Sequence, residues 1–299
     1  MRTSIEENRD LSAIKKNMER SSTPGTKTIH NGRHVMEIEN VSKSFFVYTN
    51  GGETVITEKK RFFSRKKPCE LVALKDVTLS IDHGEFVAFL GPSGCGKSTL
   101  LRILAGFESP SNGMAKCKGA CIQGPHPQRA MVFQSERAVF PWLTVESNIS
   151  LGPRLQGVDS EQRKERVAKT INLIQLTGFE KSYPRTLSGG MLQRVAVGRA
   201  IVNHPEVLLM DEPFGALDAQ TRNNLQDHLI RIWQSIEQTI VFVTHDIEEA
   251  AYLANRVVVF SARPGQIREI VKIDLPHPRE RTSPEFLEFR NHLADLIRH

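Results

Sequence analysis

The sequence has no long apolar run. None of its 299 residues falls in a stretch of the roughly 18 to 20 consecutive apolar residues that a membrane-spanning helix needs. The first twenty residues carry basic side chains but no apolar core after them, so they do not predict a secretory signal. These two absences argue against a membrane span and an export signal, and we expect the protein to stay in the cytosol.

Cysteine is also scarce. The four cysteines are Cys69, Cys95, Cys117 and Cys121, and only the last two are close together. A single C-x3-C pair without a second pair is a poor zinc signal. We expect Cys117 and Cys121 to be reduced and to flank a hairpin turn.

Basic residues outnumber acidic residues mainly in the N-terminal part of the chain. The net charge is +6, and residues 1–70 alone hold 14 Lys and Arg against 9 Asp and Glu. The densest basic run is KKRFFSRKK, residues 59–67. Three interpretations stay open for this run: a solvated loop, contact with an anionic membrane surface, or contact with nucleic acid. The last is the weakest, because the rest of the chain is nearly balanced in charge.

The order of polar and apolar stretches predicts the organisation of the chain. Residues 1–34 are polar and predict a mobile N-terminal tail. Residues 35–299 predict a folded domain that begins with an edge strand. Within it, residues 47–70 predict a basic insert in the form of a long exposed hairpin or loop. Residues 136–188 are mostly helical in pattern and predict an inserted helical subdomain.

Several short apolar runs predict the central strands of an α/β fold. Such strands are buried on both faces and lack the alternation of a half-exposed strand. The runs are EFVAFLG (85–91), VLLMD (207–211), TIVFVT (239–244) and RVVVFS (256–261). They alternate with helical patterns, such as KSTLLRILAG with Gly106 as its stop, and this alternation predicts a largely parallel sheet.

One glycine-rich loop predicts a phosphate site. GPSGCGKST, Gly91 to Thr99, fits G-x4-G-K-[ST] between an apolar strand and a helix. Gly94 and Gly96 permit backbone angles that let successive N–H groups surround an anion, and the helix N-terminus adds positive charge. Lys97 would reach the β- and γ-phosphates, and the Ser98 hydroxyl would bind Mg²⁺.

Further polar residues end or follow the predicted strands. Asp211 would deliver a carboxylate toward the metal, and Glu212 could polarise an attacking water. Gln134, after AMVF, could ligate Mg²⁺ and contact the water. His245, after TIVFVT, could hydrogen-bond the γ-phosphate. Ligands of α/β sheets bind at the carboxyl ends of the strands, where all of these residues are expected.

A second glycine-rich turn occurs in LSGGMLQR, residues 187–194. Ser188 can cap a helix, and Gly189 and Gly190 expose its first N–H groups, which predicts a second anion site. One phosphate is not easily served by both loops of one chain. Two copies facing head to tail would let each loop complete the other's site; a capped surface helix is the alternative.

Together these motifs resemble the ATPase subunit of ABC transporters, from about Val35 to the C-terminus. The phosphate loop, Gln134, LSGGMLQR, VLLMDE, the loop GALD (215–218) and His245 occur in that family's order. The resemblance implies a P-loop NTPase core with a mostly parallel sheet, an antiparallel β subdomain and an inserted helical subdomain. It also implies ATP as substrate and Mg²⁺ as cofactor.

The resemblance assigns roles to individual positions. The ATP-binding residues it implies are Phe45, Gly91, Pro92, Ser93, Gly94, Cys95, Gly96, Lys97, Ser98 and Thr99. The residues that would contact ATP from the second copy are Ser188, Gly189, Gly190 and Asp218. The implied metal ligands are Ser98, Gln134 and Asp211. The implied catalytic residues are Glu212, His245 and Gln134. Phe45 is the expected adenine-stacking residue, with Phe46 and Tyr48 as alternatives.

The resemblance also implies partners. These are a second copy of the chain, separate transmembrane permease subunits and, indirectly, a solute-binding protein, at the cytoplasmic face of the membrane. Phe140, Trp142 and Leu143 either form a partner surface or belong to the core. The runs PWLTVESNI and DEPFGALDAQTR and the C-terminal segment ARPGQIREIVKIDLPHPRERTSPEF are similar to nitrate, sulfonate and taurine importers, from which the tail 1–34 and the insert 47–70 depart. An efflux cassette or a soluble ABC ATPase acting on nucleic acid is the alternative.

Overall fold

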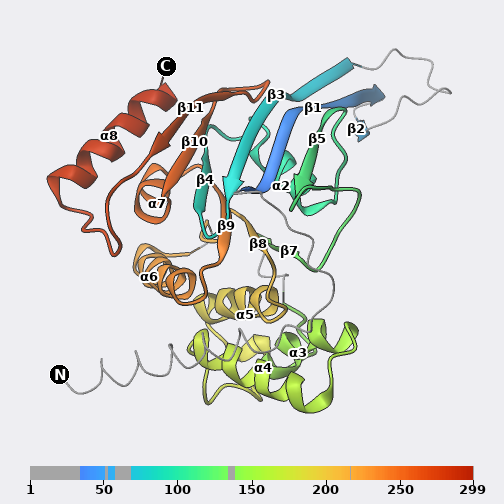
Figure 1. Cartoon of the computed structure of the whole chain (residues 1–299), viewed down its shortest axis with the longest axis vertical. Coiled ribbons are helices and arrows are strands. Elements are labelled where there is room, and N and C mark those ends of the chain that lie inside the picture. The colour runs from blue at the N-terminus through green and yellow to red at the C-terminus, as the bar shows by residue number, and fades with distance from the viewer. Residues whose placement is uncertain (1–33, 51–52, 58–68, 134–138, 216, 299) are drawn as a thin grey trace. The chain divides into compact units, whose positions relative to one another are not determined.

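The computed structural model describes residues 34–50, 53–57, 69–133, 139–215 and 217–298 (Figure 1). They form two compact units. The first, here called the terminal unit, holds the described residues up to 129 and from 241 onward, and the second, the middle unit, spans 130–240. None of the helices in these ranges is both long and apolar enough to cross a bilayer.

An antiparallel sheet opens the terminal unit. Its strands are β1 (His34–Asn50), β2 (Glu53–Thr57), β3 (Cys69–Asp82), β5 (Asn112–Cys117) and β6 (Ala120–Cys121). β1 pairs with β3 along most of its length, and on its other side it pairs first with β5 and then with β2. The expectation of an edge strand is therefore wrong. Val35, Ile38 and Val41 are all buried, but apolar residues at these positions carry no information about how many neighbours a strand has.

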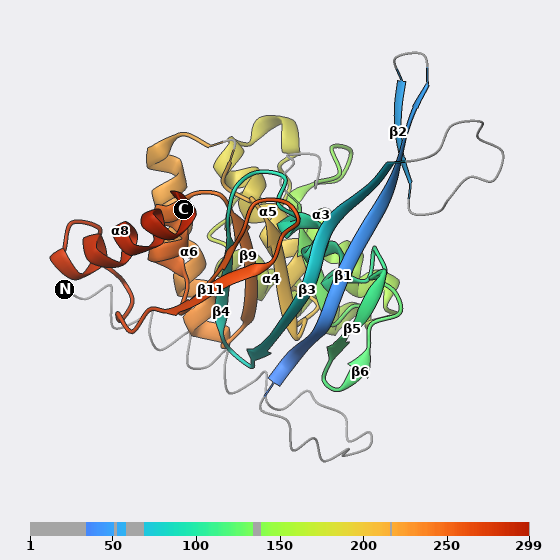
Figure 2. The ribbon, with the colours of Figure 1, turned by 90° about the horizontal axis from the view of Figure 1, so that it is seen from above.

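The described part of the insert is a hairpin. β1 and β2 pair antiparallel from Phe46 opposite Thr57 to Asn50 opposite Glu53, and the hairpin extends beyond β5 and β6 (Figure 2). The basic run 59–67 and the tail 1–33 lie outside the described residues. Cys117 and Cys121 are free and lie on the two strands of the β5–β6 hairpin, as predicted.

A second sheet forms the core of the terminal unit. Its strands are β11 (Ile267–Lys272), β10 (Arg256–Phe260), β4 (Phe86–Leu90) and β9 (Thr239–Thr244), in that order. β10 is parallel to β4 and antiparallel to β11. Every residue of β4 is buried, as the two-sided apolar run predicts. The helices of this unit are α2 (Lys97–Ala105), α7 (Ile247–Leu253) and α8 (Pro284–Arg298).

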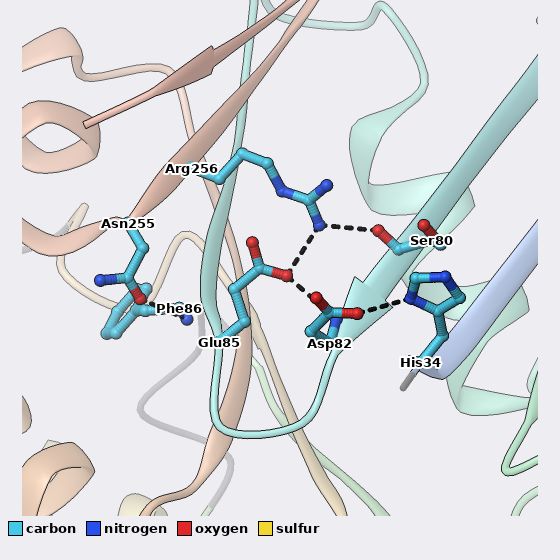
Figure 3. Close-up of polar contacts among 7 residues, drawn as sticks. All are labelled: His34, Ser80, Asp82, Glu85, Phe86, Asn255 and Arg256. Atoms are coloured by element: carbon cyan, nitrogen blue, oxygen red, sulfur yellow. Dashed lines mark hydrogen bonds and ion pairs between the residues drawn. The ribbon is translucent and has the colours of Figure 1, made fainter. Parts of the chain in front are cut away.

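A polar cluster joins the N-terminal ends of β1, β4 and β10 to the C-terminal end of β3 (Figure 3). The Arg256 guanidinium donates to the Ser80 carbonyl and to Glu85 Oε2, each at 2.7 Å. Glu85 Oε2 also accepts from the Asp82 backbone N–H, and His34 Nδ1 contacts the Asp82 carboxylate. β1, the turn after β3 and β10 are thereby connected at one place.

The C-terminal segment is held by a buried arginine. Arg279 is 5% exposed, and its guanidinium donates to the carbonyls of Ala251 and Ala254 at 2.6 and 2.7 Å. These carbonyls belong to the last turn of α7 and have no partner inside that helix. Burial lowers the pKa of Arg279 to about 10, which leaves it charged at neutral pH.

The middle unit combines helices with strands β8 and β7. Its elements are β7 (Arg129–Val132), α3 (Val145–Leu155), α4 (Ser160–Leu173), a 3-10 turn (Pro184–Thr186), α5 (Gly189–Ile201), β8 (Val207–Asp211) and α6 (Ala219–Ile236). β8 is fully buried and neighbours β7 in strand order. α3 and α4 lie within the segment for which the sequence predicts a helical subdomain.

Candidate active site

The phosphate loop follows β4 and leads directly into α2. Gly94 and Gly96 have positive φ angles of 75° and 110°, which other residues adopt at a cost. Gly96 is the N-cap of α2, and no side chain caps this helix. The N–H groups at the start of α2 are therefore not used by a side-chain cap, as binding of an anion at a helix N-terminus requires.

Lys97 is the first residue of α2 and is 4% exposed. Its Nζ donates to the carbonyls of Gly91 at 2.7 Å and Pro92 at 3.0 Å, and it lies 3.7 Å from the Cys95 sulfur. A buried ammonium group is costly without anionic or carbonyl partners. The loop thus keeps a positive charge at its centre, bound to carbonyl oxygens that a phosphate oxygen can replace.

The neighbouring strands enclose the loop closely. A Cβ on Gly91 would lie 2.9 Å from the Phe260 carbonyl oxygen of β10, and one on Gly96 would lie 2.7 Å from the Ala73 carbonyl oxygen of β3. Of the other predicted loop residues, Cys95 is buried, Pro92, Ser98 and Thr99 are partly exposed, and Ser93 is exposed.

Two further predicted residues lie in the terminal unit. His245 is exposed directly after β9, between Thr244, whose hydroxyl donates to Glu249 at 2.7 Å, and Asp246, which caps α7. Phe45 lies on β1 and is partly exposed, with Lys43 Nζ 5.1 Å from its ring centroid. Whether Phe45 or a neighbouring ring stacks on adenine stays a prediction.

The acidic pair lies in the middle unit. Asp211 is the last residue of β8 and is 9% exposed, and the next residue, Glu212, is partly exposed. Glu212 has a φ of 43°, in the left-handed region that non-glycine residues rarely occupy. Such backbone strain clusters at functional sites, and here it turns the chain sharply at the end of a buried strand.

The second glycine-rich turn begins α5. Ser188 is exposed and is the N-cap, and its hydroxyl accepts a 3.3 Å hydrogen bond from the Met191 N–H, as the sequence predicts. Gly190 has a packing role, because a Cβ there would lie 2.8 Å from the Thr221 methyl of α6. Asp218 caps α6, and its pKa is lowered mainly by the hydrogen bond from the Thr221 N–H.

The structure leaves two parts of the predicted site open. Gln134 lies outside the described residues. Asp211 and Glu212 belong to a different unit from Lys97 and Ser98. Within the described ranges, no three His, Cys, Asp or Glu side chains gather as ligands for a metal ion. One contact of the phosphate loop was missed by the sequence: the Arg263 guanidinium donates twice to the Gly94 carbonyl.

The exposed fraction of Trp142 decides between its two interpretations. Its side chain is 68% exposed, so it does not belong to the core. The centroid of its ring lies 5.2 Å from that of Phe140, and the Arg199 guanidinium lies 4.3 Å from the centroid of the Phe140 ring in a cation–π contact.

An α/β core with a parallel strand pair, a glycine loop that opens a helix and an acidic strand end define a P-loop nucleotide hydrolase. Comparisons with known proteins agree. The ABC transporter family model matches residues 74–215. The chain is 49% identical over 217 residues to the aliphatic sulfonates import ATP-binding protein SsuB of Bacillus licheniformis, covering 73% of this chain and 84% of that protein.

Two more comparisons extend the likeness. The chain is 44% identical over 252 residues to the nitrate import ATP-binding protein NrtD of Synechocystis, covering 81% of this chain and 94% of that protein. Among solved structures, a dimeric ATP-binding cassette bound to ADP and phosphate matches with a TM-score of 0.62 and 28% identity, over 81% of this chain and all of that one. The chain belongs to the ATP-binding proteins of ABC transporters, and its activity is ATP hydrolysis.

Proposed function

We propose that this ATPase drives the import of a small solute such as nitrate, a sulfonate, taurine or a similar compound. The support is the identity of 44–49% to proteins named for nitrate and sulfonate import. The cassette does not itself bind the solute, so this assignment rests on likeness, whereas the ATP chemistry rests on the chain's own residues.

In the proposed site, Gly91–Thr99 binds the phosphates of ATP. The β- and γ-phosphate oxygens replace the carbonyls of Gly91 and Pro92 as acceptors for Lys97, and the uncapped N–H groups of α2 donate to the same anion. The loop needs little rearrangement, because its glycines already hold the required backbone angles. Phe45 stacks on the adenine ring.

The residues present suit Mg²⁺. This ion prefers oxygen ligands and is usually held by one or two carboxylates together with substrate phosphates and water. Ser98, Gln134 and Asp211 offer a hydroxyl, an amide and a carboxylate oxygen, and no soft ligand is among them. When bound, the ion would neutralise charge on the phosphates. Asp211 ends a fully buried strand, which fixes the direction of its carboxylate.

Hydrolysis needs an oriented water. We assign Glu212 to polarise the attacking water and His245 to hydrogen-bond the γ-phosphate, with Gln134 contacting the water. The strained backbone at Glu212 directs the carboxylate independently of Asp211, so two adjacent acidic residues can serve different purposes.

A second copy completes each site in this proposal. Ser188, Gly189 and Gly190 bind the γ-phosphate of the partner copy, and Asp218 contacts the same nucleotide. The observation that carries this is the start of α5, where an exposed serine cap precedes two residues without side chains. The related cassette bound to ADP and phosphate is dimeric.

The permease contact is assigned to the surface around Trp142. An aromatic side chain that is 68% exposed and stacked on a neighbour is suited to a partner surface. The chain would then lie at the cytoplasmic face of the membrane as a peripheral subunit, with the solute-binding protein reached only through the permease. We expect no nucleic acid partner.

The test is Glu212→Gln in Mg-ATP. If Glu212 polarises the water, this variant binds ATP without hydrolysing it and accumulates as a dimer by light scattering. Glu165→Gln, which changes an exposed carboxylate on α4, serves as the control and should behave as wild type. A Glu212→Gln variant that stays monomeric contradicts the proposed role, and ATPase stimulation by DNA would favour the nucleic acid alternative.

A further inference from the structure

The loop between β10 and β11 is built against the phosphate loop. Ser261 and Gln266 close it, with the Ser261 N–H donating to the Gln266 carbonyl at 3.0 Å. Gly265 attaches it to β3: its N–H donates to the Ala73 carbonyl at 2.9 Å, and its carbonyl accepts from the Lys75 N–H at 3.0 Å. The position of the residues between Ser261 and Gln266 is thereby fixed.

Arg263 reaches the phosphate loop from this fixed position. Its Nε and Nη2 both donate to the Gly94 carbonyl, at 3.0 and 2.8 Å. Gly265 approaches the next carbonyl, since a Cβ there would clash with the Cys95 oxygen. Two consecutive carbonyls of the phosphate loop thus face the β10–β11 loop, and one of them accepts a forked, charge-assisted pair of hydrogen bonds.

The Gly94 carbonyl shares a planar peptide group with the Cys95 N–H. In a trans peptide the two point in opposite directions, so a carbonyl held on one side turns the N–H to the other. The Cys95 N–H makes a long 3.4 Å contact with the Pro92 carbonyl across the phosphate loop. A cation on the carbonyl oxygen also polarises the peptide group and strengthens its N–H as a donor.

We propose that Arg263 is a positioning residue for phosphate binding. It holds the Gly94–Cys95 peptide so that its N–H faces the bound phosphate and its carbonyl, which would repel an anion, faces away. The guanidinium also adds positive charge behind the loop. This inference rests on the proposed role of Gly91–Thr99 as the phosphate site.

The test compares nucleotide binding by four full-length variants. Arg263→Met removes both hydrogen bonds and the charge, and should raise the Kd for ATP about tenfold, the size expected for a charge-assisted pair. Arg263→Lys keeps the charge without the fork and should recover part of the loss. Arg268→Met removes an exposed arginine on β11 and should match wild type. Lys97→Ala tests the phosphate site itself.

Three readouts separate positioning from other roles. In steady-state hydrolysis, Arg263→Met should raise KM while kcat stays near that of wild type. Inorganic tripolyphosphate, used to displace labelled ATP, should lose affinity by the same factor as ATP. The thermal unfolding midpoint of Arg263→Met should equal that of Arg268→Met. If Arg263→Met does not fold, Arg263→Gln, which keeps one donor group, replaces it.

Distinct results overturn distinct claims. If Arg263→Met binds ATP as Arg268→Met does while Lys97→Ala loses binding, Arg263 has no positioning role. If ATP is weakened but tripolyphosphate is not, Arg263 acts on the nucleoside and the proposal is wrong. If Lys97→Ala binds ATP as wild type does, the phosphate site itself is wrongly assigned.

Discussion

The two glycine-rich turns of this chain begin helices in different ways. At α2 the N-cap is Gly96, which provides no side-chain cap, and a buried lysine follows. At α5 the N-cap is Ser188, whose hydroxyl already accepts from the Met191 N–H, and no lysine follows. The first turn combines an uncapped helix start with a buried lysine, whereas the second has its first N–H groups partly used by its own serine cap and no buried lysine at its start.

The glycines of the two turns also serve different ends. Gly94 and Gly96 occupy left-handed backbone angles, so their role is conformational. Gly190 is helical, and the space for its missing Cβ is taken by Thr221 of α6. Glycines in similar motifs therefore have different roles: Gly94 and Gly96 shape the predicted phosphate loop, and Gly190 permits close packing of α5 on α6. This difference supports one complete site and one that acts only with a partner.

The largest expected effect comes from Ser188→Arg. An arginine at this exposed cap would obstruct approach of a second copy, so turnover should fall to background while ATP binding by the monomer, measured by equilibrium dialysis, should stay at the wild-type value.

Asp159→Arg is the matched control, because it also removes a helix N-cap and adds an arginine, on α4. It should keep turnover within about a factor of two, since an N-cap is worth about 1 kcal/mol of stability and does not touch nucleotide. If Ser188→Arg abolishes binding to the monomer as well, the assignment of this turn to the partner's ATP is wrong.

Gly190→Ala should have a smaller effect that a second change can reverse. Its Cβ would lie 2.8 Å from Thr221 Cγ2, so the free energy of unfolding should fall by about 1–3 kcal/mol, the usual cost of overpacking. Gly190→Ala with Thr221→Ser removes that methyl, and should recover both stability in urea unfolding and turnover. Recovered stability without recovered turnover would show that the ligand, rather than α6, requires a glycine here.

An effect on stability alone, dependent on pH, is expected at the α5–α6 contact behind the second turn. His228 of α6 is 5% exposed, lines a small pocket with Gln193, Arg194 and Leu225, and neither ring nitrogen has a hydrogen-bond partner among the described residues. Burial, followed by the charges of Arg194 and Arg231, lowers its pKa to about 4.

An unfolded histidine binds a proton near pH 6.5, so between pH 6.5 and 4 the unfolded chain takes up protons that the folded chain does not. The free energy of unfolding should therefore fall as the pH drops through this window, by at most about 3 kcal/mol for His228, and level off below it. His228→Leu should flatten this slope in urea unfolding at pH 7 and 5, and exposed His126→Gln should not. An unchanged slope in His228→Leu would contradict a neutral buried ring.

Local features of both turns could be read from the sequence. The two-sided apolar runs at 86–90 and 207–211 predicted buried strands. Ser188 was predicted as a helix N-cap and caps α5. Gly106 was predicted to end a helix and ends α2, where it adopts a φ of 84°. Each of these depends on a few neighbouring residues, so a short stretch of chain is sufficient to specify it.

Other features could not be read in that way. The three pairing partners of β1, the 68% exposure of Trp142 and the contact between Arg263 and Gly94, 169 positions apart, depend on which distant segments meet. Arg263 precedes a Pro-Gly turn, and nothing in that pattern specifies which loop its guanidinium reaches.

The sequence by itself determined the chemistry: a glycine loop with its lysine, an acidic strand end and a capped glycine turn, because backbone angles and side-chain donors are properties of a few consecutive residues. The tertiary structure alone decided what encloses the phosphate loop, which glycine is required by packing, and which arginine holds a loop peptide in place. Those depend on the approach of strands and helices distant in the chain, which no local pattern encodes.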